Sequence, residues 1–250
     1  MKLLNLYHQL IIYVFVLIFS HSCAGQIEYK SIIHFVDNKN IDSIGYESVN
    51  DGNDLSIASI FLYRNSLILA DNFYGNIKII DLNSGTIKSS ARLSIYRNPW
   101  ISDIIVFKSK IVVSSYLDSM YVLDLNLKPN FSIYCPIGEK FFVSMNDSTF
   151  TVFNSIKSEC YHFNSEFKVD TINSCFIDIW GKASFLKSYD YVTMKNEKFI
   201  ILPQSKIKLN TDFPEKLIPY EGFNLDFNGN QLVYFEIVKN KVVFHIYKYK

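Results

Sequence analysis

Three aspartates are the side chains of this sequence best suited to do chemistry. Asp103, Asp178 and Asp226 each lie at or near the start of a strand-rich segment. Two carboxylates about 5–10 Å apart can act as general acid and base in glycoside hydrolysis. Converging carboxylates can also bind a cation or a sugar and shift one another's acidity. The competing and favoured interpretation is that each aspartate caps a turn or lies in solvent.

Two tryptophans are the second set of candidates. Trp100 follows Pro99, and Trp180 precedes Gly181, at comparable points of two segments. An exposed indole ring can stack on a sugar or a peptide, whereas a buried one fills space between sheets, which is the favoured interpretation. The three aspartates and two tryptophans together are the predicted ligand-facing residues.

The sequence carries no strong catalytic or metal-binding motif. It has no GxSxG elbow, HExxH pair, Walker loop or dinucleotide fingerprint. His34, His162 and His245 lie far apart in strand-like segments, where a histidine is usually structural. The oxygen-rich run 50–54 lacks the downstream glutamate of an EF-hand loop, so a solvated turn is favoured over a calcium site. We therefore predict no catalytic residue, no metal and no cofactor.

Composition narrows the class of partner and the redox chemistry. The 25 basic and 24 acidic residues nearly cancel, and no Lys/Arg-rich run could follow a phosphate backbone, so nucleic acid is excluded as a partner. The 17 tyrosines and 21 phenylalanines favour strands. Cys135, Cys160 and Cys175 allow one disulfide at most, and buried free thiols are the favoured interpretation.

The first 26 residues are typical of an exported protein. Lys2 precedes an unbroken apolar run over 10–19, which is too short to span a bilayer and suits a signal peptide. The run is followed by Ser20-His21-Ser22-Cys23-Ala24. We predict a removed signal peptide over 1–22, a lipid on Cys23 and a short tether over 23–26. Ordinary cleavage to a soluble secreted or periplasmic protein, and an uncleaved anchor, are the alternatives.

The rest of the chain shows weak self-similarity at about forty residues. Apolar strands end in polar turns at Asp81, Asp124 and Asn164, which are 43 and 40 residues apart. Each unit contains a meander of about four strands, which is typical of a β-propeller blade. The early strands of each unit are apolar nearly throughout, as expected between blades. Later strands alternate, as in Ile77-Lys78-Ile79, which predicts a half-solvated outer edge.

The two ends of the chain support the same architecture. The last unit has three strands before Lys250, and the segment 27–36 can supply the fourth. Such pairing closes the ring and removes exposed edges. We therefore predict an all-β fold: a propeller of four-stranded blades over 27–250, with five units traced and a sixth left open. An irregular β-sandwich is the alternative.

With these features the chain resembles Bacteroidetes lipoproteins that carry TolB-like or NHL-like six-bladed propeller domains. The residues that carry the resemblance are Ser22-Cys23 and the recurring strand ends at 80–85 and 123–126. The sequence departs from that pattern by showing five units and few blade glycines. The resemblance implies an architecture and a location, and no specific chemistry.

These observations favour a non-catalytic binding or scaffold module. It would be a monomer held by its lipid in the cell envelope, most simply at the outer membrane, and would bind a protein, peptide or glycan. The alternative is a propeller-type carbohydrate hydrolase or lyase that uses convergent carboxylates, with or without a divalent cation.

Overall fold

The computed structural model describes residues 27–47, 57–93, 100–175, 190–194, 197–202, 205–208, 225–228 and 231–249. Within these ranges the chain forms strands and turns and no helix, which confirms the all-β prediction. Within the same ranges, no helix is long and apolar enough to cross a membrane.

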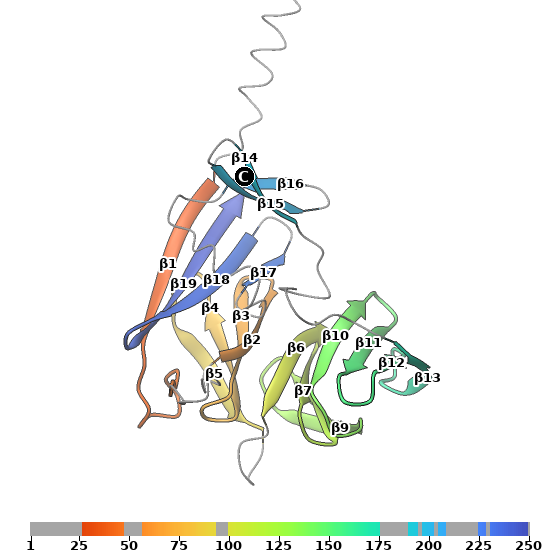
Figure 1. The fold of residues 1–250 in the computed structure, drawn as a ribbon. Coiled ribbons are helices and arrows are strands. Elements are labelled where there is room, and N and C mark those ends of the chain that lie inside the picture. Colours follow the sequence, from red (N-terminus) through yellow and green to blue (C-terminus); the bar gives the residue numbers. More distant parts are fainter. Residues whose placement is uncertain are drawn as a thin grey trace, which may run out of the picture.

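The strands of the described part form five antiparallel sheets (Figure 1). The first three sheets are each built from four consecutive strands: β2 (Ile57–Tyr63), β3 (Ser66–Asp71), β4 (Asn76–Asp81) and β5 (Ile87–Arg92); β6 (Ile101–Phe107), β7 (Lys110–Ser115), β8 (Ser119–Asp124) and β9 (Pro129–Tyr134); β10 (Lys140–Met145), β11 (Phe150–Asn154), β12 (Glu159–Phe163) and β13 (Val169–Ser174). The fourth sheet contains β14 (Asp190–Met194), β15 (Glu197–Leu202) and β16 (Ser205–Lys208). The last contains β17 (Leu225–Asn228), β18 (Gln231–Val238), β19 (Lys241–Tyr249) and β1 (Ile27–Phe35).

The N-terminal strand completes the last sheet. The strand order is β1-β19-β18-β17, and Ile32 lies opposite Phe244 in the β1–β19 register. The predicted pairing of the two ends of the chain is therefore confirmed. Closure of the whole ring depends on segments 176–189 and 209–224, which lie outside the described residues, and it stays a prediction.

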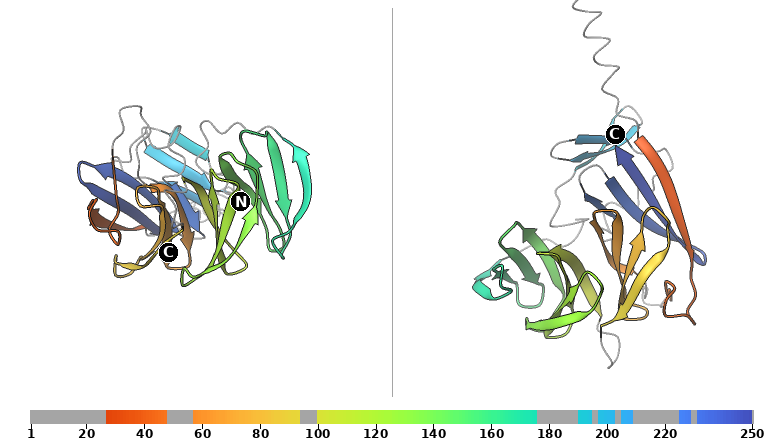
Figure 2. Two further views of the ribbon diagram at one scale, coloured as in Figure 1. Left: turned by 90° about the horizontal axis from the view of Figure 1, so that it is seen from below. Right: turned by 180° about the vertical axis from the view of Figure 1, so that it is seen from behind.

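The sheets are arranged as propeller blades. The first strand of one sheet lies against the first strand of the next, as β17 contacts β2, β2 contacts β6 and β6 contacts β10 (Figure 2). The fourth strands lie farthest out, and β9 and β13 are exposed along most of their length. This radial order, with inner strands buried and outer strands solvated, defines the β-propeller fold.

The turns that suggested the repeat are structurally equivalent. Asp81, Asp124 and Asn164 each end the third strand of a sheet or directly follow it. In each case one side-chain oxygen accepts two backbone N–H groups of the following turn, at 2.6–3.1 Å. A short polar side chain is required here because it satisfies turn donors that the ladder leaves free.

One prediction about the third strands is wrong. Ile77 and Ile79 are buried, as expected, but Lys78 between them is also fully buried. Its ammonium pairs with the carboxylate of Asp71 at 2.6 Å. The alternation in this strand therefore marks an internal ion pair and not a solvated edge.

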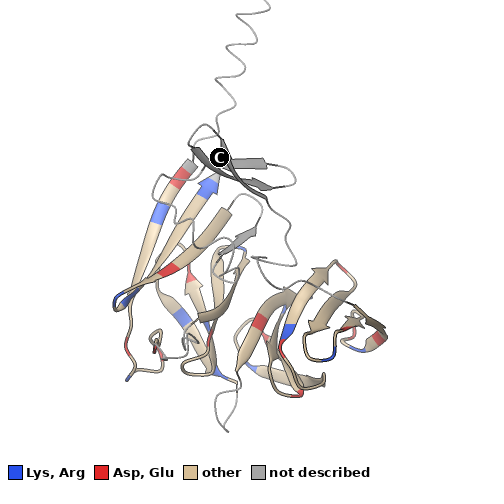
Figure 3. Ribbon diagram, in the orientation of Figure 1, with Lys and Arg blue, Asp and Glu red and all other residues tan. Residues whose placement is uncertain are grey.

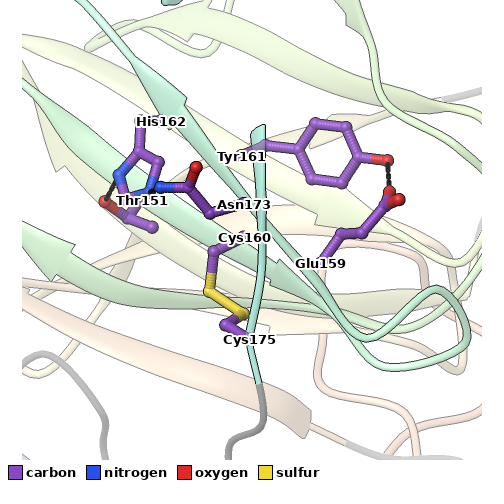
Figure 4. The surroundings of a disulfide bond; sticks show 7 residues. All are labelled: Thr151, Glu159, Cys160, Tyr161, His162, Asn173 and Cys175. Atoms are coloured by element: carbon purple, nitrogen blue, oxygen red, sulfur yellow. Dashed lines mark hydrogen bonds between the residues drawn. A yellow bond between two sulfur atoms is a disulfide. The ribbon is translucent and has the colours of Figure 1, made fainter. Parts of the chain in front are cut away.

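The favoured interpretation of the cysteines is also corrected. Cys160 of β12 and Cys175, which directly follows β13, form a disulfide with a Cα–Cα distance of 5.8 Å (Figure 4). The bond fastens the exposed outer strand of the third sheet to its neighbour. Cys135 is a buried free thiol, as expected for all three. Burial raises the pKa of the Cys135 thiol to about 11, so it stays protonated near neutrality.

Candidate functional site

Buried polar side chains gather at one end of the first three sheets. We call this the polar end: it contains the turns β3–β4, β7–β8 and β11–β12 and the starts of β6 and β10. The residues are Asp71, Asn72, Asn76, Lys78, Asp103, Ser114, Ser115, Lys140 and Asn154. Since a buried polar group is stable only when it is hydrogen-bonded, their partners show what this end is built to hold in place.

The first cluster surrounds the ion pair of the first sheet. The Lys78 ammonium donates to Asp71 and, at 3.0 Å, to the side-chain oxygen of Asn76, and it lies 4.9 Å from the centre of the Tyr74 ring. Burial lowers the pKa of Lys78, and the charge of Asp71 opposes that shift. Asp71 also accepts the backbone N–H groups of Phe73 and Tyr74, so it fixes the β3–β4 turn.

Three further polar side chains each hold a loop of a neighbouring strand or sheet. Asn72 makes two hydrogen bonds with the backbone of Ile101, at 2.7 and 2.9 Å. The Lys140 ammonium donates to the carbonyls of Ser115, Leu117 and Gly138. Burial lowers the pKa of Lys140, because desolvation disfavours the charged ammonium. Within the described residues, no carboxylate forms an ion pair with it.

Asn154 completes this set in the third sheet. Its amide donates to the carbonyl of Pro136 at 2.8 Å, and its oxygen accepts the N–H groups of Ile156 and Lys157. The turn β11–β12 and the connection into β10 are thus held by one side chain.

Above this polar layer lie five exposed apolar side chains. They are Trp100, Tyr116, Leu117, Ile137 and Ile156, with exposed fractions of 42%, 39%, 42%, 56% and 57%. We call this set the apolar rim. Soluble proteins seldom expose apolar side chains in a contiguous group unless the group contacts a partner.

The loops of the apolar rim touch one another in sequence. The Tyr116 N–H donates to the carbonyl of Trp100 at 2.8 Å, and the Gly138 N–H donates to the carbonyl of Tyr116 at 2.9 Å. A Cβ on Gly138 would lie 3.2 Å from Ile156, and its φ of 141° also favours glycine. The rim is therefore one surface that crosses from the second sheet to the third.

The backbone of Trp100 adds a second sign of functional geometry. Its φ is 46°, in the left-handed region, which is unfavourable for a bulky L-residue. Residues held in such conformations concentrate at binding and catalytic sites, because the surrounding structure must enforce them. Here the adjacent Ile101 is clamped by Asn72.

The first sheet shows how such a surface is covered. Its turn β3–β4 carries Phe73 and Tyr74, which correspond in position to the rim residues, and segment 36–47 folds over them. The Tyr74 hydroxyl donates to the carbonyl of Asp37 at 2.6 Å, and the Gly45 N–H donates to Asp71. A Cβ on Gly45 would lie 2.2 Å from the Phe73 ring, so only glycine allows this approach.

Two of the sequence-predicted site residues, Asp103 and Trp100, lie in different environments. Asp103 is buried, and its carboxylate accepts from the Ser59 hydroxyl at 2.8 Å and from the N–H groups of Ile104 and Phe142 at 2.7 and 3.0 Å. It thus links the inner strands β2, β6 and β10. Trp100 is exposed and belongs to the apolar rim.

The other predicted residues lie wholly or partly outside the described ranges. Asp178 and Trp180 lie outside the described residues, as do Cys23 and the loop 50–54. Asp226 lies in β17 opposite Val233, and its side chain is outside the described part. Of the three aspartates, the structure describes the side chain of Asp103 alone, so their convergence stays a prediction. Among the described residues, no group of three or more His, Cys, Asp or Glu is placed to hold a metal ion.

Sequence reasoning missed four of the five rim residues. The available signal was an apolar residue inside a polar turn, as in Ser115-Tyr116-Leu117-Asp118 and Asn154-Ser155-Ile156-Lys157. A turn usually exposes polar side chains, so isoleucine or leucine there needs an explanation. The pattern becomes informative only when the repeat places those turns at the same end.

Fold and site together define a β-propeller whose blades carry an apolar surface on one end. The sequence matches no protein-family model and no curated relative. Among solved structures, the chain is similar to Raptor of Chaetomium thermophilum (TM-score 0.40, 9% identity, 78% of this chain and 16% of that one). It is also similar to BamB of Moraxella catarrhalis (0.37, 15%, 77% and 57%) and to apo AztD of Citrobacter koseri (0.38, 14%, 53% and 38%). The chain thus spans 57% or less of the length of each.

Proposed function

We propose that this chain is an exported, lipid-anchored propeller that binds a protein of the bacterial cell envelope through its apolar rim, as a binding or scaffold module. The observation that carries the proposal is the group of exposed residues Trp100, Tyr116, Leu117, Ile137 and Ile156 on adjoining loops, over a hydrogen-bonded polar layer. Aromatic and aliphatic anchors on rigid loops lose little conformational entropy on binding.

The covered turn of the first sheet supports a protein partner. Segment 36–47 provides the backbone carbonyl of Asp37 to Tyr74 and a close contact of Gly45 to Phe73. A polypeptide segment of a partner would cover Tyr116, Leu117 and Ile156 in the corresponding way. Aliphatic side chains favour protein over glycan, because sugars are bound mainly by aromatic faces and polar groups.

Export and anchoring complete the proposal. Residues 1–22 have the pattern of a signal peptide, and Cys23 is the proposed lipid-bearing residue. A disulfide between Cys160 and Cys175 is consistent with an oxidising compartment outside the cytoplasm. Metabolic labelling with palmitate should label the wild-type chain and Cys135→Ala, and should fail for Cys23→Ala. Label retained in Cys23→Ala would contradict the anchor.

The binding surface is tested by charge substitutions with a matched control. Leu117→Asp and Ile156→Asp place a carboxylate in the rim, while Ile172→Asp places one on β13, where isoleucine is 52% exposed. The full chain is expressed in cells, cross-linked in the envelope and purified, and cross-linked proteins are identified by mass spectrometry. We expect the rim variants to lose about tenfold or more of a specific cross-linked protein, which corresponds to roughly 1.4 kcal/mol or more per buried anchor.

Two outcomes would contradict the protein-binding proposal. One is equal cross-linking in the rim variants and in Ile172→Asp. The other is binding to purified envelope polysaccharide that Trp100→Ala abolishes and Leu117→Asp leaves intact, because the ligand would then be a glycan. Thermal unfolding of each variant excludes misfolding, since exposed substitutions shift stability by roughly 0.5 kcal/mol or less.

A further inference from the structure

A groove between the first and second sheets lies at the opposite end of the strands from the apolar rim. It has a volume of about 400 Å³ and is lined by residues of the turn β2–β3, of β3, β4 and β5, and of the turn β8–β9. Its inner wall is apolar, with Ile68, Ile79 and Leu125 from the contact between the two sheets. A groove of this size accommodates a small organic molecule.

The mouth of the groove is cationic. Arg64 and Lys88 line it, together with Tyr63 and Asn126, and none of its lining residues within the described part is acidic. Figure 3 shows basic and acidic residues mixed over the described sheets, whereas the charged residues that line the groove itself are both basic. Such a site favours an anion.

The two cations differ in how much charge they offer to a ligand. Lys88 is paired with the carboxylate of Asp81, which is itself capped by the N–H groups of its turn. Arg64 makes no ion pair within the described residues, and its guanidinium lies 5.1 Å from the centre of the Tyr63 ring. A guanidinium that lies over an aromatic ring keeps its planar donors available for a bidentate carboxylate contact.

We infer that this groove binds a small organic carboxylate whose apolar body lies against Ile68, Ile79 and Leu125 while its carboxylate contacts Arg64. This site is separate from the apolar rim, and its ligand is independent of the proposed envelope partner. The positive φ of Arg64, 55°, places the residue at the tip of a tight turn and fixes where its side chain emerges.

The test uses fluorinated probes and the full chain in nanodiscs of zwitterionic lipid. Fluorine NMR measures binding of 3-(4-fluorophenyl)propionate, of its uncharged primary amide, and of the propionate in competition with inorganic phosphate. Empty nanodiscs provide the background. Arg64→Asn removes the guanidinium and keeps a residue that tolerates left-handed backbone. Lys39→Asn is the charge-matched control in segment 36–47, at the other end of the sheets.

The inference predicts that the propionate binds at least tenfold more tightly than its amide. Arg64→Asn should weaken binding about tenfold, because it removes a charge-assisted contact. Lys88→Met should weaken it less, and Lys39→Asn should leave it unchanged. Equal binding of the amide, an unchanged affinity in Arg64→Asn, or no propionate binding would overturn the inference. Competition by phosphate at the same concentration would overturn the requirement for an apolar body.

Discussion

Replacing Lys140 with methionine tests whether the polar end positions the apolar rim. The Lys140 ammonium is fully buried and donates to the carbonyls of Ser115, Leu117 and Gly138, which flank rim residues. Methionine has a similar length and is apolar, so the change removes the three hydrogen bonds with little change in packing. The Lys140 side chain is buried beneath the rim, so its replacement acts on the rim indirectly.

The expected loss of stability follows from the three carbonyls. A buried acceptor without a donor costs roughly 1–3 kcal/mol, which gives about 3 kcal/mol at the lower end for the three. Removing a buried charge offsets part of that, since burial lowers the pKa of Lys140 and so disfavours the ammonium. We expect Lys140→Met to lower the free energy of unfolding by about 2 kcal/mol, or the Tm by about 4–8 °C.

Hydrogen exchange separates a local effect from a general one. In Lys140→Met, the amides of Tyr116 and Gly138 should exchange faster than those of β3 and β4, because their loops lose a shared anchor. Lys157→Met, an exposed lysine in the turn β11–β12, is the control and should change neither stability nor exchange. Uniform acceleration over all strands, or wild-type stability in Lys140→Met, would refute the positioning role.

The pH dependence of stability in wild type and in Lys140→Met gives a second check on the burial of Lys140. Because burial lowers the pKa of Lys140 below its ordinary 10.5 in the folded state, the folded chain releases this proton at a lower pH than the unfolded chain. Between the two pKa values the unfolded state binds more protons, so stability contributed by this group rises with pH. The difference in unfolding free energy between wild type and Lys140→Met should therefore grow as pH rises toward 10.5. A shrinking difference would contradict the burial argument.

Three further predictions concern single interactions. Asp71→Asn leaves Lys78 buried without its counter-charge and should lower the free energy of unfolding by about 3–5 kcal/mol, measured with denaturant. Adding Lys78→Met should recover part of this loss. No recovery would show that the pair does not act as a unit. The double variant Cys160→Ser, Cys175→Ser removes a disulfide that joins residues 15 positions apart, and it should lower the free energy of unfolding by about 2–3 kcal/mol. Proteolysis of β13 should become faster. Unchanged cleavage would contradict the role of the disulfide in fastening β13. The neighbouring Lys88, together with turn N–H groups, lowers the pKa of Asp81 to about 2, so the stability that this carboxylate contributes is present above pH 3.8 and is lost as pH falls toward 2. Asp81→Asn should remove that part of the acid sensitivity, and identical acid titrations would contradict it.

The repeat could be predicted because it is local in the sequence. Asp81, Asp124 and Asn164 each cap the turn that follows them, so their spacing directly reports the spacing of blades. The pairing of Ile32 with Phe244 was also accessible, since an unfinished last unit and an isolated first strand satisfy each other's edges. Both inferences use hydrogen bonds within one sheet.

The buried ion pair and the disulfide could not be obtained in this way. Alternation around Lys78 is the same whether the lysine faces water or a carboxylate; the difference is made by Asp71, which comes from the adjacent strand. Three cysteines allow three pairings or none, and the choice between them depends on how β13 lies against β12. In each case the deciding contact joins residues whose distance the sequence pattern leaves open.

The buried side chains of the polar end hold the loops of the apolar rim in position. Loops that expose Trp100, Leu117 and Ile156 to water would fold back onto apolar surface if nothing held them. Lys140 and Asn154 prevent this by binding loop carbonyls from below, so the exposed side chains keep their positions without a partner. Burying an unpaired ammonium and several amides is a poor way to gain stability alone. It is a reasonable way to keep an apolar surface open for binding, and this is why loosening Lys140 should weaken partner binding as well as folding.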